Sequence, residues 1–291
     1  MFASIYGSMR ITAALLTATL LLLAAQSHAQ SVAMVTDATG KAVRLGGATP
    51  APLAILAELA ADTRVQLEAG ARVSVLLLQS GDEYILEGPA LISFAAREPV
   101  ALSGTAPRKR AGMPTRTRDV RISGGAVTQA AIIMRNMRVT ARIKLLNLHN
   151  TRALTPDPEF RWTSDEAGAR YTFVLSDDTG KSLYQTEVNA TSLRLPASVQ
   201  LRDSAGHTWE VSARLSDGRR YVSHGDFTIA SADLRARVEA ARPAPDAAVS
   251  DRVVFAAWLN QMELKDEARG YWRTLAQERP EDAGLKRLAG E

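Results

Sequence analysis

The sequence predicts a mainly β protein, with a small antiparallel β domain, then a β-sandwich, then a C-terminal α-helical hairpin. Short bursts of alternating apolar and polar residues, separated by Gly and Asp, fill residues 32–96. A similar alternation with more aromatic side chains fills residues 142–230, and residues 231–291 change to apolar steps of three and four. A period of two is typical of half-buried strands and a period near 3.6 of helices, so these patterns define the fold class.

The first 29 residues have the pattern of a secretory signal peptide. Arg10 precedes an apolar run over residues 11–25, and Ser27 and Ala29 place small residues where a signal peptidase cuts. The run is shorter than the roughly twenty residues that a membrane-spanning helix needs. We therefore expect cleavage near Ala29 and a periplasmic protein, with an uncleaved N-terminal anchor as the alternative. The chain has no cysteine, so we do not expect a lipoprotein, disulfides or thiolate chemistry.

Residues 32–96 are expected to form the small antiparallel β domain. Val65 and Leu67 alternate with polar residues, and so do Val73 and Val75. Turn-forming Gly and Asp separate these runs at residues 37–40, 68–71, 80–82 and 87–89. One short helical stretch is expected at residues 53–60.

This order of turns and buried positions resembles that of the periplasmic FecR-type β domain. The likeness rests on residues 63–89, where a Gly-Ala turn at 70–71 and a Gly-Asp turn at 81–82 separate three hydrophobic strands. The resemblance implies an exported β domain. A signalling regulator of the FecR type is one alternative function, and it would require a cytoplasmic N-terminal region that we expect this chain to lack.

Residues 142–230 are expected to form the β-sandwich. Phe160 and Trp162 alternate along one strand, and Tyr171 and Phe173 along another. Residues 177–180 and 217–218 have the composition of hairpin turns, so six or seven strands are expected. The sequences at 158–162, 169–171 and 207–211 resemble fibronectin type III-like modules of bacterial envelope proteins, which implies a binding or spacing role.

Residues 231–291 are expected to be helical. Ser231 is a good N-cap, and Pro243 ends the first short helix. Two further helices and the start of a third follow, and residues 264–280 are similar to one tetratricopeptide hairpin. Trp258, Tyr271 and Trp272 supply so much apolar surface that we expect the helices to dock on the sandwich, with a groove for a partner protein as the alternative.

The sequence predicts no catalytic, cofactor-binding or metal site, and we expect a protein that is not an enzyme. After the signal peptide only His149, His207 and His224 remain, and no pair of them has the spacing of a zinc motif. A hydrolase acting on cell-wall polymers is the rival hypothesis. Its carboxylates would come from two pairs, Asp82 with Glu83 and Asp157 with Glu159.

Residues 97–141 are expected to form a basic connector between the two β units. Between residues 97 and 152 there are twelve Lys or Arg against two acids, a local net charge of +10. The expected contacts with an anionic polymer are Arg108, Lys109, Arg110, Arg116, Arg118 and Arg121. An exported chain would meet anionic envelope polymers or lipid head groups there rather than nucleic acid, and a solvated linker without a ligand is the alternative.

Together these features predict a non-enzymatic, exported envelope protein that acts as a binding or scaffold module. The expected partner is another envelope protein or an anionic envelope polymer, with contact to a membrane surface through the basic connector.

Overall fold

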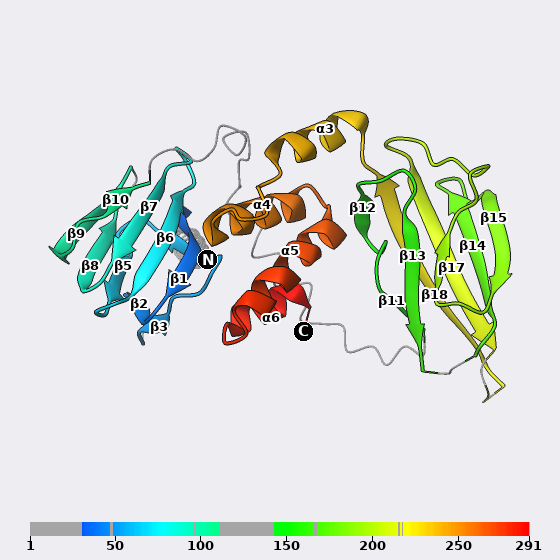
Figure 1. The fold of residues 1–291 in the computed structure, drawn as a ribbon, viewed down its shortest axis with the longest axis horizontal. Coiled ribbons are helices and arrows are strands. Elements are labelled where there is room, and N and C mark those ends of the chain that lie inside the picture. Colours follow the sequence, from blue (N-terminus) through cyan, green and yellow to red (C-terminus); the bar gives the residue numbers. More distant parts are fainter. Residues whose placement is uncertain are drawn as a thin grey trace, which may run out of the picture.

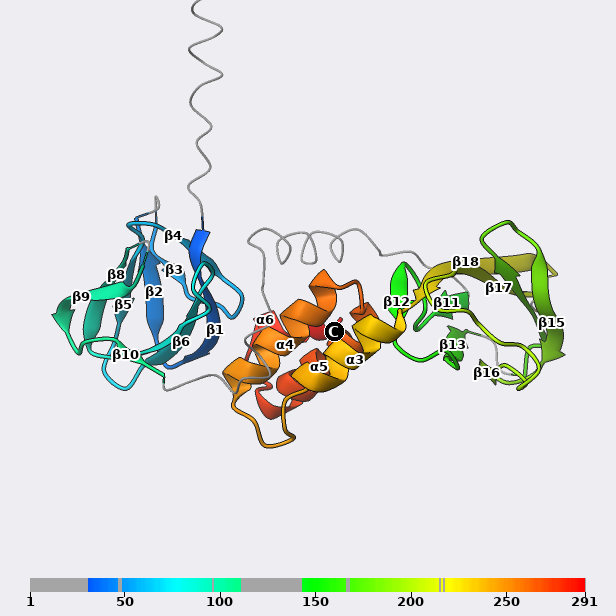
Figure 2. The same cartoon turned by 90° about the horizontal axis from the view of Figure 1, so that it is seen from above.

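The protein consists of three parts that lie in a row, with a β unit at each end and helices between them (Figure 1; Figure 2 gives the view from above). The computed structural model describes residues 31–46, 49–95, 97–110, 143–165, 168–214, 216 and 218–290. The predicted signal peptide lies outside these residues. Antiparallel β units followed by C-terminal helices confirm the predicted fold class.

The first β unit is built from two five-stranded sheets, in the orders β10-β7-β6-β1-β4 and β3-β2-β5-β8-β9. The strands are β1 (Ser31–Thr39), β2 (Ala42–Leu45), β3 (Ala51–Pro52), β4 (Glu58–Ala60), β5 (Arg64–Leu67), β6 (Arg72–Leu77), β7 (Glu83–Glu87), β8 (Ala90–Phe94), β9 (Pro99–Gly104) and β10 (Arg108–Lys109). Val65 and Leu67 are buried between exposed neighbours on β5, as their alternation predicts.

Two strands of this unit are buried on both faces. On β1, Ala33 and Val35 belong to the core inside the unit, whereas Met34 belongs to a second core on the other face. On β6, Val75 and Leu77 face inward and Leu76 faces the second core. A strand covered on both sides needs a continuous apolar run, because neither face meets water. The outer face of these two strands therefore packs against the second core, which the helices form.

The expected helix at residues 53–60 is wrong. Leu56 has a φ of 65°, which a right-handed helix cannot contain, and Leu59 lies on β4. The Leu56 amide donates to the Val35 carbonyl and the Val35 amide to the Ala57 carbonyl, at 2.8 and 3.0 Å. Pairing with β1 thus overrides the local helical spacing.

The expected start of the connector at residue 97 is also wrong. β9 pairs with β8, and β10 pairs with β7 through Arg108 opposite Ile85 and Lys109 opposite Tyr84. Residues 99–104 and 108–109 are therefore strands of the first β unit, each at the edge of a sheet. The remainder of the predicted connector, residues 111–141, lies outside the described part of the chain.

The second β unit is a sandwich of two sheets, in the orders β11-β13-β16 and β12-β18-β17-β14-β15. Its strands are β11 (Ile143–Leu145), β12 (Thr151–Ala153), β13 (Glu159–Ser164), β14 (Tyr171–Asp177), β15 (Ser182–Val188), β16 (Ser192–Arg194), β17 (Gly206–Arg214) and β18 (Arg220–Ile229). The turn at residues 178–181 joins β14 to β15 as the predicted hairpin. All pairs are antiparallel except β12 with β18.

The sandwich core is aromatic. Phe160 packs edge to face on Phe173, Trp209 and Phe227, with ring centroids 5.0 to 5.7 Å apart. The Trp209 indole donates to the Leu148 carbonyl at 2.7 Å. Gly225 lies opposite Trp209 on β18, and a Cβ there would come within 2.8 Å of both the indole nitrogen and that carbonyl. Only glycine therefore fits beside this buried hydrogen bond.

Four helices follow the sandwich: α3 (Ala232–Ala241), α4 (Val249–Gln261), α5 (Lys265–Glu278) and α6 (Ala283–Ala289). Ser231 caps α3 as predicted, since its hydroxyl accepts a hydrogen bond from the Leu234 amide. Their buried side chains form one core with Met34, Ile55, Leu56 and Leu76 of the first β unit. No helix in the described part of the chain has the length and hydrophobicity needed to cross a membrane.

The helices are attached differently from the prediction, which placed them on the sandwich. Their apolar face packs on the first β unit, and α4 lies against β1. On the sandwich side, polar groups of α5 and of the turn between α4 and α5 bind the chain around β12, and Ala230 and Leu154 pack against the helical core. The C-terminal helices thus reach back to the first β unit and hold both β units.

Candidate functional site

Three of the six predicted basic contact residues are described, and each is paired with an acid. Arg108 reaches Glu87 at 2.9 Å and Lys109 reaches Asp82 at 2.9 Å, and both pairs are exposed. Arg110 is part of a buried cluster. Arg116, Arg118 and Arg121 lie outside the described residues, so their role remains a prediction.

Arg110 joins the first β unit to α4. Its guanidinium contacts Glu83 on β7 at 2.7 Å and holds both carboxylate oxygens of Asp251 on α4 at 2.9 Å. Ser250 is also in hydrogen-bond range, at 3.0 Å. Glu83 and Asp251 are almost fully buried, and these two acids raise the pKa of Arg110 further above its usual range. Arg110 therefore has a structural role in place of the predicted contact with a polymer.

The three predicted aromatic contact residues lie in the helical core. Trp258 and Trp272 are 2% and 1% exposed, and Tyr271 is partly buried against Phe255. Arg237 lies over the Trp258 ring, 5.9 Å from its centroid. The rings pack within the molecule, so the folded state described here does not present them as an open groove.

Three of the four carboxylates of the hydrolase hypothesis lie beside cations. Glu83 is bound by Arg110, and Asp82 is bound by Lys109. Asp157 is exposed and Glu159 lies 4.0 Å from Arg194, both on the other β unit. Within the described ranges, no three His, Asp or Glu side chains come together in a way that could hold a metal ion.

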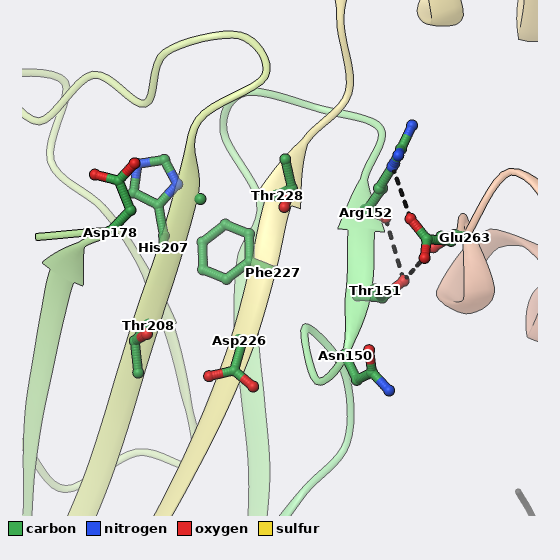
Figure 3. A pocket seen from close by; sticks show the side chains of 11 residues that line it. Asn150, Thr151, Arg152, Asp178, His207, Thr208, Asp226, Phe227, Thr228 and Glu263 are labelled. Carbon is green, nitrogen blue, oxygen red and sulfur yellow. Dashed lines mark hydrogen bonds and ion pairs between the residues drawn. The ribbon is translucent and has the colours of Figure 1, made fainter.

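A concavity of about 300 Å³ lies over the sandwich sheet where β12, β18 and β17 run side by side (Figure 3). Residues directly opposite each other on neighbouring strands share a face of the sheet. Thr208 is opposite Asp226, and Thr228 lies between Gly206 and Arg152. Since Gly206 has no side chain, the sheet is uncovered at that position, and this leaves a hollow bordered by polar groups.

The concavity has acidic character. Asp178, Asp226 and Glu263 contribute three carboxylates, against one guanidinium from Arg152. Arg152 is bound to Glu263 at 3.1 Å, which leaves Asp178 and Asp226 as the carboxylates without a cation beside them in the lining. Asn150, Thr208 and Thr228 add amide and hydroxyl groups. Such a surface suits a ligand that donates hydrogen bonds and carries positive charge.

His207 borders the concavity through its place on β17, but its ring belongs to the other face of the sheet. It lies opposite Phe227 and stacks on that ring, with centroids 5.3 Å apart. Burial lowers the pKa of His207, and the Ala205 carbonyl partly opposes this effect. The ring is therefore mainly neutral at pH 7. His224 lies further along the strands, opposite Glu210.

Sequence reasoning missed this concavity because its residues come from five separate segments, each ordinary by itself. Asp178 lies in the hairpin turn after β14, and Asp226 alternates with buried residues on β18. Glu263 lies in the turn between α4 and α5. Only the pairing of β12, β18 and β17 brings them together, and no local spacing encodes that pairing.

No family model matches the chain, and no curated protein matches it in sequence. Similar solved structures include CopC from Methylosinus trichosporium OB3b, which is 14% identical over 31% of this chain and 95% of that one, with a TM-score of 0.25. The fn3 domain of human collagen alpha-1(XX) chain is 17% identical over 38% and 90%, with a TM-score of 0.24. A beta-glucuronidase of Parabacteroides merdae is 12% identical over 30% and 14%, with a TM-score of 0.23. TM-scores this low carry no conclusion about function.

Proposed function

We propose that this protein is a non-enzymatic, exported scaffold of the cell envelope that binds another envelope protein. The observation that carries the proposal is the shared core of the helices and the first β unit, which joins parts from opposite ends of the sequence. Partly buried ion pairs of Arg110 with Asp251 and of Arg279 with Asp37 reinforce it. An architecture of this kind joins two β units through one helical part, and this supports a scaffold role.

The two β units are the presenting modules of this scaffold. Their resemblance to a FecR-type β domain and to a fibronectin type III-like module supports a binding role, because such modules bind or space other components. The helical part is similar to one tetratricopeptide hairpin, and its role here is to join the modules. Export through the predicted signal peptide, with cleavage near Ala29, belongs to the same proposal.

The concavity over Gly206 is the proposed contact for the partner. Its unpaired carboxylates at Asp178 and Asp226 favour a lysine or arginine side chain of the partner over an anionic polymer. Among the described residues, the predicted anionic contacts Arg108, Lys109 and Arg110 are neutralised by neighbouring acids. A contact with anionic polymer would therefore depend on Arg116, Arg118 and Arg121.

Crosslinking followed by co-purification from envelope extract tests this proposal. The variant Asp178→Asn/Asp226→Asn is expected to lose the captured partner, because it removes both carboxylates from the concavity. The matched control Asp157→Asn/Glu187→Gln removes the same charge from exposed positions of the same sandwich and is expected to keep the partner. Equal capture by both variants would contradict the proposed contact. Failure of the wild-type protein to capture any specific partner would contradict the scaffold itself.

A turnover assay on purified envelope polymers separates the scaffold from the hydrolase. We expect no turnover, because cations hold Asp82 and Glu83. In the other pair, Asp157 is exposed and Glu159 lies 4.0 Å from Arg194. Turnover that disappears in Asp157→Asn or Glu159→Gln would establish the hydrolase instead.

A further inference from the structure

The junction between the helical part and the sandwich is built from polar groups. The turn between α4 and α5 binds β12, since the Glu263 carbonyl accepts from the Arg152 amide at 2.8 Å and from the Thr151 hydroxyl at 3.0 Å. Asp266, in the first turn of α5, accepts from the Leu148 amide at 2.7 Å. Lys265 donates to the Asn150 carbonyl at 2.6 Å. Apolar contacts of Ala230 and Leu154 with the helical core accompany these polar contacts.

Glu267 is the exception among the acids of this junction. One of its oxygens, Oε1, accepts from the Leu154 amide at 3.3 Å, just after β12. The other oxygen, Oε2, is shielded from solvent and has no hydrogen-bond partner. An ionised carboxylate with a buried, unpaired oxygen costs free energy, whereas a protonated carboxyl group carries a smaller desolvation cost.

The charges around Glu267 do not offset this cost. Asp266 precedes it on α5 and repels its negative charge, while Arg242, just after α3, attracts it. Arg242 is itself bound by both oxygens of Glu239, at 2.9 and 3.0 Å, which neutralises much of its field. Burial is the largest influence, and it raises the pKa of Glu267 above its ordinary value of 4.5, although the backbone amides of Glu267 and Leu154 act in the opposite direction.

We propose that protonation of Glu267 strengthens the attachment of the sandwich to the helical part. The carboxyl group lies between α5 and the chain after β12, and its Oε2 is buried and has no hydrogen-bond partner. The inference concerns a conformational property of the chain and does not depend on the proposed partner. It also reaches the concavity, because Glu263 lies at the rim of that hollow and begins the same turn that Glu267 helps to anchor.

The direction follows from linkage. Glu267 in the docked junction binds its proton more tightly than a solvated carboxyl group, so docking gains free energy as pH falls from neutrality through the raised pKa toward 4.5. Each unit by which the pKa is raised changes the docking equilibrium roughly tenfold between the ionised and protonated forms. At neutral pH the ionised group weakens the junction, which leaves the sandwich freer to move.

Because the chain has no cysteine, spin labels can be placed at single sites. Gln79→Cys on the first β unit and Asn189→Cys on the sandwich are exposed positions, on opposite sides of the junction. Double electron–electron resonance then gives the distribution of distances between the labels. We expect the wild-type distribution to be narrower at about pH 5 than at about pH 7.5.

The variant Glu267→Gln mimics the protonated group and is expected to give the narrow distribution at both pH values. Glu263→Gln is the matched control: it removes an exposed carboxylate from the same turn, and it is expected to keep the pH dependence of the wild type. Hydrogen exchange at the Leu154 amide, corrected for the intrinsic effect of pH, gives a second measurement on the unmodified protein, with stronger protection expected at the lower pH. A wild-type distribution that does not change with pH, or a Glu267→Gln variant that follows the wild type, would overturn the inference.

Discussion

Arg110 shows how one side chain can hold two parts of a molecule together. It is the only cation bound to the buried carboxylates of Glu83 and Asp251 among the contacts described, and its guanidinium fits Asp251 in a two-point arrangement. Removing one partner of a buried ion pair leaves an uncompensated charge, which costs far more than the pair itself contributes.

We expect Arg110→Met to lower the free energy of unfolding by roughly 3–5 kcal/mol, measured by urea denaturation. Arg108→Met removes a neighbouring arginine whose ion pair with Glu87 is exposed, and it should cost less than about 1 kcal/mol. Replacing the acids as well, in Arg110→Met/Glu83→Gln/Asp251→Asn, should recover much of the loss. Equal effects of Arg110→Met and Arg108→Met would show that the buried cluster is not important for stability.

His207 gives the sandwich a pH dependence opposite to that of Glu267. Burial lowers the pKa of His207 below 6.5, so the unfolded chain binds a proton more tightly than the folded sandwich does. The contribution of neutral His207 to the free energy of unfolding is therefore fully present above pH 6.5. It is lost as the pH falls, by roughly 1.4 kcal/mol for each unit of difference between the folded and unfolded pKa. Hydrogen exchange of β17 under mildly denaturing conditions should show this decrease in the wild type and a smaller one in His207→Gln. The exposed His224→Gln should behave as the wild type does.

At the scale of elements, alternation predicted β5, β13 and β14, which each have buried residues between more exposed neighbours. It could not predict β4, because the segment around Leu56 has helical spacing and becomes extended only through hydrogen bonds to β1. It also could not predict β9 and β10, which are the edge strands of their sheets. Val100 and Leu102 on β9 and both residues of β10 are exposed, so neither strand has an alternating buried face. The run Val75-Leu76-Leu77-Leu78 did carry a signal that was not used, since a continuous apolar run indicates a strand buried on both faces.

β10 is expected to protect its basic residues from trypsin in the native protein. Trypsin cleaves a native protein only where a segment can leave the folded structure. β10 is held by its pairing with β7, and the next residue, Arg110, donates its amide to the Glu83 carbonyl at 2.8 Å. We therefore expect trypsin to cut the native protein after Arg108, Lys109 and Arg110 much more slowly than it cuts the urea-unfolded chain at the same bonds. Mass spectrometry of the early fragments measures this, and early fragments that end at Arg108 or Lys109 would contradict it.

At the scale of the whole molecule, the sequence predicted three parts but not how they are joined. The apolar positions of α4 and α5 were recognised, yet nothing in their spacing says which β unit covers them. The structure shows that Met34 and Leu76 do so from the first β unit, while the sandwich contributes both polar and apolar contacts. The concavity over Gly206 was missed for the same reason, because it exists only after distant strands pair.

The central claim is that the first β unit and the C-terminal helices share one core, and Trp272 tests it. Trp272 lies in that core at 1% exposure, on α5, and Trp→Ala at such a site should cost roughly 3–5 kcal/mol.

Hydrogen exchange measured by mass spectrometry on the wild type and on Trp272→Ala is the most direct measurement. We predict that the amides of β1 lose protection together with those of α5, although Met34 and Trp272 are far apart in the sequence. β14 and β17 of the sandwich should keep their protection. Loss of protection confined to the helices, with β1 unchanged, would contradict the shared core.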